Sequence, residues 1–164
     1  MKKITLIILT IIMFTGCSNF MYVARNVTGH ELYIIPDFEF FDSYHNIAGF
    51  IRSNVQYQSE SGDYWKNPEE TWNEHCGDCE DFAILFMNIV YISTGEKLDL
   101  VLVNIDDIKE VNSIDDIPDA PQKINGVLNH AMCAKGKLLI DPYTGKYFSG
   151  ATHKRYSFDY IFGM

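Results

Sequence analysis

The sequence reads GDCEDFA at residues 77–83, and Cys79 in this run lies between a turn and a strongly apolar segment. From Cys79 onward, apolar residues recur at the spacing of one helix face. This pattern predicts a helix over residues 79–93, ended by Thr94-Gly95, with Cys79 at the N-terminal end of its buried face and therefore at the edge of the core. The apolar positions are Phe82, Ala83, Phe86, Ile89 and Val90.

The start of this helix favours an ionised thiol at Cys79, because unpaired backbone N–H groups and the helix dipole stabilise negative charge there. Three neighbouring acids, Asp78, Glu80 and Asp81, act in the opposite direction, since nearby negative charge raises the pKa of a thiol. A reactive thiolate at Cys79 therefore requires a positively charged partner, and a protonated histidine supplies one.

A histidine and an aspartate follow in the second half of the chain. His130 lies in a predicted strand over residues 127–134, on the same face as Met132, so its ring is expected to point inward. A turn joins this strand to an antiparallel partner over residues 138–140, and Asp141 ends that partner within a residue or two of His130. The candidate nucleophile, base and orienting acid are Cys79, His130 and Asp141.

The remaining segments place helices before strands. Asn67 and Pro68 have the residue types of an N-cap and a first helical position, which fixes the start of a short helix. The order of elements predicts an α+β fold, in which the Cys79 helix packs on an antiparallel sheet. The predicted elements are helices over 43–56 and 68–75, strands over 98–105 and 156–162, and an acidic loop over 106–121.

The N-terminus has the layout of a secretory signal. Two lysines precede an apolar run over residues 4–14, which is too short to cross a bilayer. The FTGC that ends at Cys17 resembles a bacterial lipobox, in which cleavage leaves this cysteine as the lipid-bearing N-terminus; an ordinary signal peptide is the alternative. The predicted organisation is a signal peptide over 1–16, a lipidated tether and irregular lead over 17–42, and a catalytic domain over 43–164.

The charge of the chain excludes nucleic acid as a partner. Loss of residues 1–16 removes two lysines and no acid, so the net charge changes from −9 to −11. A surface of this sign repels nucleic acid and anionic lipid headgroups. Membrane attachment is therefore expected through the lipid on Cys17, which would hold the protein in the cell envelope, facing the periplasm or the exterior.

Three further cysteines leave two other chemistries open. Cys76 and Cys79 form a C-x-x-C pair, but a redox motif of this kind would follow a strand, and a helix start precedes it here. Together with His75 and Cys133 they have the ligand types of a zinc site, without a second paired spacing. The sequence therefore predicts neither a metal nor a cofactor.

Three motifs, taken in order, resemble the transglutaminase-like superfamily, and within it the bacterial transglutaminase-like cysteine peptidases. The resemblance implies a papain-like core with Cys79 as nucleophile, His130 as general base and acid, and Asp141 as the residue that orients His130. Met132-Cys133 departs from the bulkier residues that often follow the histidine in that family. The matching segments are GDCEDFA at 77–83, NHA at 129–131 and IDP at 140–142, with a similar lead-in YWKNPEET at 64–71, so that the resemblance covers 57–145.

This resemblance implies an acyl-transfer enzyme, a peptidase or amidase that acts on protein or peptide substrates at the envelope. Water would resolve the thioester formed on Cys79, whereas an amine in its place would make the protein a cross-linking transglutaminase. The alternative of a different class is a binding module that keeps the fold without the activity. The backbone N–H of Cys79 is one natural oxyanion donor, and Gln56, Tyr57 and Trp65 are candidates for the second.

Overall fold

The central element of the protein is helix α4, Cys79–Thr94. The computed structural model describes residues 29–36, 38, 40–59, 64–117 and 128–164. Asp78 caps the start of α4 and Gly95 ends it with φ of +72°, a left-handed conformation that glycine adopts without strain. Every residue from Asp81 to Val90 is buried, so the predicted helix is confirmed, although its buried surface extends beyond the one expected face.

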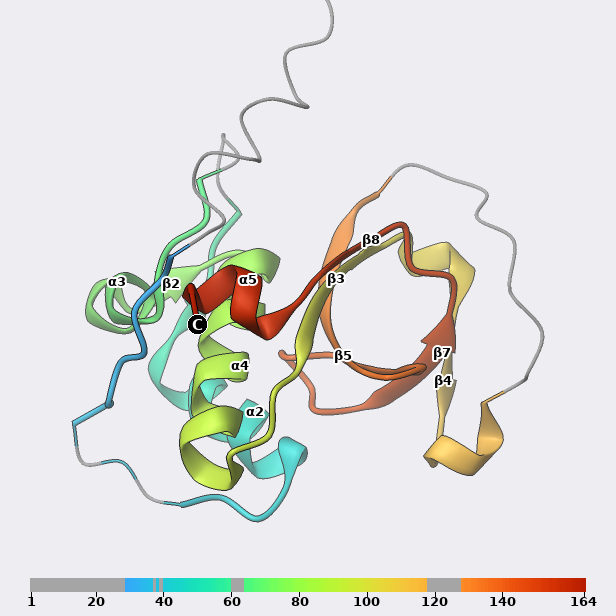
Figure 1. Ribbon diagram of the computed structural model, residues 1–164, viewed down its shortest axis with the longest axis horizontal. Coiled ribbons are helices and arrows are strands. Elements are labelled where there is room, and N and C mark those ends of the chain that lie inside the picture. The colour runs from blue at the N-terminus through green and yellow to red at the C-terminus, as the bar shows by residue number, and fades with distance from the viewer. Residues whose placement is uncertain (1–28, 37, 39, 60–63, 118–127) are drawn as a thin grey trace, which may run out of the picture.

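An antiparallel sheet packs against α4 through strand β5, and Figure 1 shows it curling on one side of the molecule while the helices gather on the other. All five strand pairings of this sheet are antiparallel, which confirms the α+β class. The strand order is β4-β7-β6-β5-β3-β8. The strands are β3 (Asp99–Val103), β4 (Ile108–Val111), β5 (His130–Lys135), β6 (Leu138–Ile140), β7 (Tyr147–Gly150) and β8 (Lys154–Tyr156).

The two faces of the sheet bury different side chains. Ala131 and Cys133 of β5 belong to the main core, which includes the buried face of α4. Met132 and Ala134 belong to a smaller core together with residues of β3 and β6. This alternation along β5 follows from the two-residue period of a strand. It means that both faces of the central strands are buried, as expected from the apolar sequence of β3.

The N-terminal helices cover the rest of α4. Helix α2, Tyr44–Asn54, and helix α3, Pro68–Glu74, both pack against it and confirm the two predicted helices. Asn67 caps α3 in a capping box with Glu70. A short parallel pair, β1 (Gln56–Tyr57) and β2 (Cys76–Gly77), joins the segments that follow α2 and α3. The predicted turn at residues 77–78 is therefore wrong for Gly77, which lies in β2.

The described part of the lead before α2 contains no helix or strand, yet it packs onto the domain. The buried Asn88 of α4 exchanges two hydrogen bonds with the backbone of Tyr33, at 2.9 and 2.8 Å, and Ile35 is buried nearby in the main core. The lead therefore satisfies a polar group that α4 would otherwise bury unpaired. No described helix is long and apolar enough to cross a membrane. Cys17 and the predicted signal peptide lie outside the described residues.

The predicted strand over residues 156–162 is wrong. Strand β8 ends at Tyr156, and helix α5, Phe158–Phe162, follows it. Ser157 caps α5 by accepting a hydrogen bond from the backbone of Tyr160. Three apolar residues of α5 at helix spacing, Phe158, Ile161 and Phe162, are buried in the main core. The Ser157 cap and this burial select a helix over the strand that the aromatic content favoured.

The predicted loop over residues 106–121 is also corrected, because it contains strand β4 between two short 3-10 turns. Strand β4 forms because β7, a strand the sequence did not reveal, offers it an edge: Ile108 pairs with Gly150 and Val111 with Tyr147. The strand predicted over 127–134 is confirmed from His130 onward. Asn129 precedes the strand, and its side chain accepts a hydrogen bond from the backbone of Ile105 instead.

Candidate active site

The approach to Cys79 is fixed by the carboxylate of Asp81, one turn into α4. Asp81 is fully buried, and its Oδ2 accepts a hydrogen bond from the backbone N–H of Asp78 at 3.2 Å. In return, the Asp78 side chain accepts from the backbone N–H of Asp81. This capping box holds the residue before Cys79 against the helix and satisfies donors that a helix start leaves unpaired.

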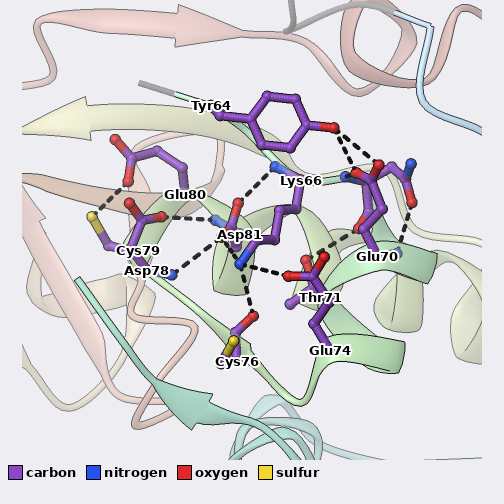
Figure 2. A network of polar contacts seen from close by, with 11 residues as sticks. Tyr64, Lys66, Glu70, Thr71, Glu74, Cys76, Asp78, Cys79, Glu80 and Asp81 are labelled. Carbon is purple, nitrogen blue, oxygen red and sulfur yellow. Dashed lines mark hydrogen bonds and ion pairs between the residues drawn. The ribbon is translucent and has the colours of Figure 1, made fainter. Parts of the chain in front are cut away.

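A buried lysine in the segment before α3 contacts this helix start. Lys66 is 7% exposed; its backbone N–H donates to Asp81 Oδ1 at 2.8 Å and its Nζ lies 3.8 Å from Asp81 Oδ2. The same ammonium donates to the carbonyl of Cys76 at 3.2 Å and lies 3.1 Å from Glu74. Figure 2 shows Asp81 between Lys66 and the Cys79–Glu80 pair. The network therefore links three chain segments around the candidate nucleophile.

Glycine is required at position 77 by this packing. A Cβ built on Gly77 would lie 2.7 Å from the Cβ of Asp81 and 2.9 Å from its Oδ2, closer than real contacts. His75, just before β2, has a φ of +55° as the C-cap of α3, and its Nδ1 lies 3.1 Å from the carbonyl of Asn54. The His75 ring thus contacts backbone away from Cys79.

The thiol of Cys79 is half-buried and donates a hydrogen bond to Oε2 of Glu80 at 2.9 Å. Burial raises the pKa of Cys79 well above its ordinary value, and the Glu80 carboxylate raises it further, whereas a hydrogen bond from the backbone of Ala131 acts to lower it. Burial and the adjacent Glu80 therefore outweigh the helix start, and the pKa moves in the direction that the neighbouring acids led us to expect. In this arrangement the resting thiol keeps its proton.

Asp78 carries the other carboxyl group beside the thiol. Burial, followed by repulsion from Glu80 and Asp81, raises the pKa of Asp78 to about 8. Asp78 is therefore mostly protonated at neutral pH, so less negative charge surrounds Cys79 than the sequence suggests. The cause is physical proximity: three carboxyl groups at one helix start cannot all ionise at their ordinary pKa.

His130 and Asp141 lie together beside this helix start. His130 is the first residue of β5, and its Nε2 lies 3.9 Å from Oδ1 of Asp141. The register pairs Ile140 with Cys133, so that Asp141 follows the last paired residue of β6. The two side chains are thus close together, as predicted. The ring of His130, however, is partly exposed at the strand end and does not lie inside the core.

Asp141 is held as an ionised acceptor. Burial acts to raise the pKa of Asp141, but the neighbouring His130 and hydrogen bonds from the backbone of Tyr143 and the Thr144 hydroxyl outweigh burial and lower it. The Tyr143 and Thr144 bonds measure 2.9 and 2.8 Å and belong to the tight turn between β6 and β7. An oriented, ionised carboxylate beside an imidazole is the arrangement that fixes a histidine tautomer.

The three predicted residues converge through the backbone of β5. The thiol of Cys79 bonds to the backbone of Ala131, the residue next to His130, and His130 in turn faces Asp141. The hydrogen-bond acceptor of the thiol in the described structure is Glu80 and not His130. Cys79 therefore lies near the start of β5, where His130 faces Asp141, and its thiol is turned to its neighbouring acid.

Three aromatic rings pack together near the start of α4. Tyr57 of β1, Phe82 of α4 and Tyr143 lie with ring centroids 5.5–6.1 Å apart. The guanidinium of Arg52 lies over the Tyr143 ring, 5.6 Å from its centroid. Sequence reasoning missed Tyr143 and Lys66. Lys66 carried a weak signal, since a lysine directly after Trp65 and before a helix cap stands out in a chain with an excess of acids.

The other cysteines do not join this group. Cys76, Cys79 and Cys133 are all free thiols, and Cys133 is buried with its sulfur 3.5 Å from the carbonyl of Ala83. Among the residues that the structure describes, no cluster of three or more His, Cys, Asp or Glu side chains is placed to hold a metal ion.

Comparisons of the chain with protein-family models, with curated proteins and with solved structures returned no match. The resemblance to transglutaminase-like peptidases therefore stays a prediction drawn from the three motifs and their order.

Proposed function

We propose that the protein is a cysteine-nucleophile acyl-transfer enzyme with a papain-like core, acting as a peptidase or amidase. The observation that supports this most is the convergence of Cys79, His130 and Asp141 at one end of β5, with the thiol against the backbone of Ala131 and His130 Nε2 3.9 Å from Asp141. A thiol, an imidazole and a carboxylate near one strand end are the residue types that an activated nucleophile and an oriented base require.

The reaction begins when the Glu80 side chain turns away and His130 accepts the thiol proton. The sulfur of Cys79 then attacks the substrate carbonyl, and His130 returns the proton to the leaving amine. Water, deprotonated by His130, hydrolyses the resulting thioester and frees the acid. Asp141 keeps the imidazole in one orientation throughout and stabilises its charged form. An amine that entered in place of water would give cross-linking instead.

A digestion in heavy-oxygen water tests this function and its variant together. The purified chain is incubated with a mixed peptide pool, and the products are read by mass spectrometry. Hydrolysis gives shorter peptides with heavy oxygen in the new carboxyl group, while transamidation gives branched peptides without it. The absence of both products from every peptide in the pool, in wild type as in Cys79→Ser, would refute the proposal.

One observation favours a second function, a binding module of the same fold without activity. The pKa of Cys79 is raised by burial and by Glu80, and its thiol is bonded to this acid. A nucleophile needs the opposite shift unless the acid moves. Whether Glu80 restrains the thiol therefore distinguishes the enzyme from the binding module.

Glu80→Gln should make Cys79 more reactive. Removing the carboxylate lowers the pKa of the thiol, so the rate of alkylation by iodoacetamide at neutral pH should rise by on the order of tenfold, since each pKa unit changes the thiolate fraction by about ten. The pH profile of alkylation should move to lower pH. Glu69→Gln, an exposed acid of α3, is the matched control and should leave the profile unchanged. An unchanged profile in Glu80→Gln would show that Glu80 does not restrain the thiol.

We further propose that the protein is a lipoprotein of the cell envelope, anchored through Cys17. Expressed in a bacterium, the full chain should partition into the detergent phase, because several acyl chains on one residue give stable anchoring. Cys17→Ala should move it to the aqueous or precursor fraction. Recovery of unmodified wild-type protein in the aqueous phase would contradict the lipid anchor.

A further inference from the structure

The short parallel pair β1–β2 places a tyrosine hydroxyl beside the candidate nucleophile. Tyr57 pairs with Gly77, two residues before Cys79, and the N–H of Gln58 donates to the carbonyl of Gly77 at 2.8 Å. The backbone of Tyr57 is thus held next to the segment that leads into α4. Because this pairing fixes the position of the strand, the tyrosine ring has a defined place at the helix start.

The ring of Tyr57 packs against two aromatic residues near the start of α4. Its centroid lies 6.1 Å from that of Phe82 and 6.1 Å from that of Tyr143. The side chain is 47% exposed, which puts it at the open side of the site, where a substrate would enter. Burial raises the pKa of Tyr57, and the thiol and carboxyl groups at the helix start, Cys79, Asp78 and Glu80, raise it further, which places the hydroxyl within interaction distance of these groups. The hydroxyl therefore remains a protonated donor.

The two other candidates for this position are less well placed. Trp65 is 3% exposed, and its ring packs edge-on against Tyr156 of β8 with centroids 5.5 Å apart. Gln56 precedes Tyr57 in β1, so that strand alternation turns its side chain to the opposite side. Of the three residues, Tyr57 combines an exposed polar group with an electrostatic interaction with Cys79 in the described structure.

A backbone donor is present at the same point. The N–H of Asp81 donates to the Asp78 side chain and that of Phe82 to the Asp78 carbonyl. The N–H of Cys79 is the first of the helix and has no partner within it. The helix start and the neighbouring strand β1 therefore provide one backbone N–H and one hydroxyl close to the sulfur.

We propose that the Tyr57 hydroxyl is the second donor of the oxyanion hole, acting with the backbone N–H of Cys79; this inference rests on the proposed acyl transfer. When the sulfur–carbon bond forms, the carbonyl electron pair moves to oxygen, and this oxygen accepts hydrogen bonds from both donors. When the tetrahedral species collapses, the carbonyl reforms, the carbon–nitrogen bond breaks, and the amine leaves with the proton that His130 held. The tyrosine proton stays on Tyr57.

The test compares Tyr57→Phe with Tyr160→Phe, which removes a tyrosine hydroxyl of similar exposure (45%) from helix α5. The probe is p-nitrophenyl acetate, whose good leaving group isolates the attack step. Tyr57→Phe should lower the acylation rate constant by about 10²–10³-fold with little change in KM, the usual effect of removing one oxyanion donor. Tyr160→Phe should stay within about threefold of wild type, because its ring stacks on Tyr156 of β8 and has no part in the proposed reaction.

A second readout separates an oxyanion donor from a packing residue. Alkylation of Cys79 by iodoacetamide forms no oxyanion, so its maximal rate at high pH should be the same in Tyr57→Phe and wild type. An acylation rate of Tyr57→Phe close to wild type, or an equal loss of alkylation and acylation, would overturn the inference while the acyl-transfer function stands. A wild type that is not acylated at all would refute the proposed function, and the inference with it.

Discussion

Cys79→Ser should abolish the acylation by p-nitrophenyl acetate and the hydrolysis of peptides, a loss on the order of 10⁴-fold or more. A serine hydroxyl in place of the thiol is a far weaker acid and would keep its proton in a site that already raises the pKa of Cys79. The side chains are similar in size, so the free energy of unfolding should change by about 1 kcal/mol or less. Stopped-flow release of nitrophenolate and urea unfolding provide the two measurements.

Cys76→Ser is the matched control for this prediction. Cys76 lies three residues before Cys79 and is a free thiol of similar exposure, but its sulfur has no role in the proposed reaction. The variant should retain acylation within about threefold of wild type. If Cys76→Ser loses as much activity as Cys79→Ser, the C-x-x-C pair acts as a unit, and redox chemistry or shared metal binding replaces the triad as the explanation.

Asp81→Ala should cause the largest loss of stability among substitutions near the site, about 3–5 kcal/mol. The change removes the buried partner of Lys66, and it leaves the backbone N–H groups of Lys66 and Asp78 without their acceptor. Each buried N–H group left without an acceptor costs about 1–3 kcal/mol, and the buried ammonium loses the attraction of a fully buried carboxylate, although Glu74 and the Cys76 carbonyl still contact it. Urea unfolding followed by circular dichroism measures the change.

Glu74→Ala removes the exposed ion-pair partner of the same lysine, Lys66. Glu74 lies 3.1 Å from the Lys66 ammonium, but its side chain is 55% exposed. Water screens this ion pair, so its loss should cost less than about 1 kcal/mol. Equal effects of Asp81→Ala and Glu74→Ala would show that burial does not decide the contribution of this network, contrary to the role assigned to Asp81.

The sequence predicted α4 well because every local signal agreed. The apolar spacing and the stop at Gly95 favour the same helix, and the structure confirms its bounds to within a residue. The reach between His130 and Asp141 was also predictable, since a tight turn between β5 and β6 leaves little freedom of register. Local agreement of this kind makes an element independent of distant contacts.

Other elements depend on contacts that no local pattern contains. Strand β4 exists because β7 pairs with it, and its acidic surroundings resemble a solvated loop. Helix α5 is only five residues long, so its apolar aromatic sequence fits a strand equally well until the Ser157 cap is seen. The Lys66–Asp81 pair joins residues 15 positions apart across α3, and no helix or strand period relates them.

The contact between Cys79 and Glu80 was only half predictable. The sequence shows that acids flank the thiol, and it indicates the direction in which they move its pKa. It does not show that the raised pKa of Asp78 removes one of those charges at neutral pH, because this depends on burial of three carboxyl groups together. Whether the thiol bonds to Glu80 or to His130 is likewise set by side-chain geometry at the helix start.

The most direct test of the account is to trap the acyl group. Wild type and His130→Ala are mixed with p-nitrophenyl acetate, quenched in acid during turnover, digested and mapped by mass spectrometry. The account predicts an acetyl thioester on Cys79 in wild type and a rate of its formation lower by at least about 10²-fold in His130→Ala. No acetyl group on Cys79, or the same rate of acetylation without His130, would contradict it.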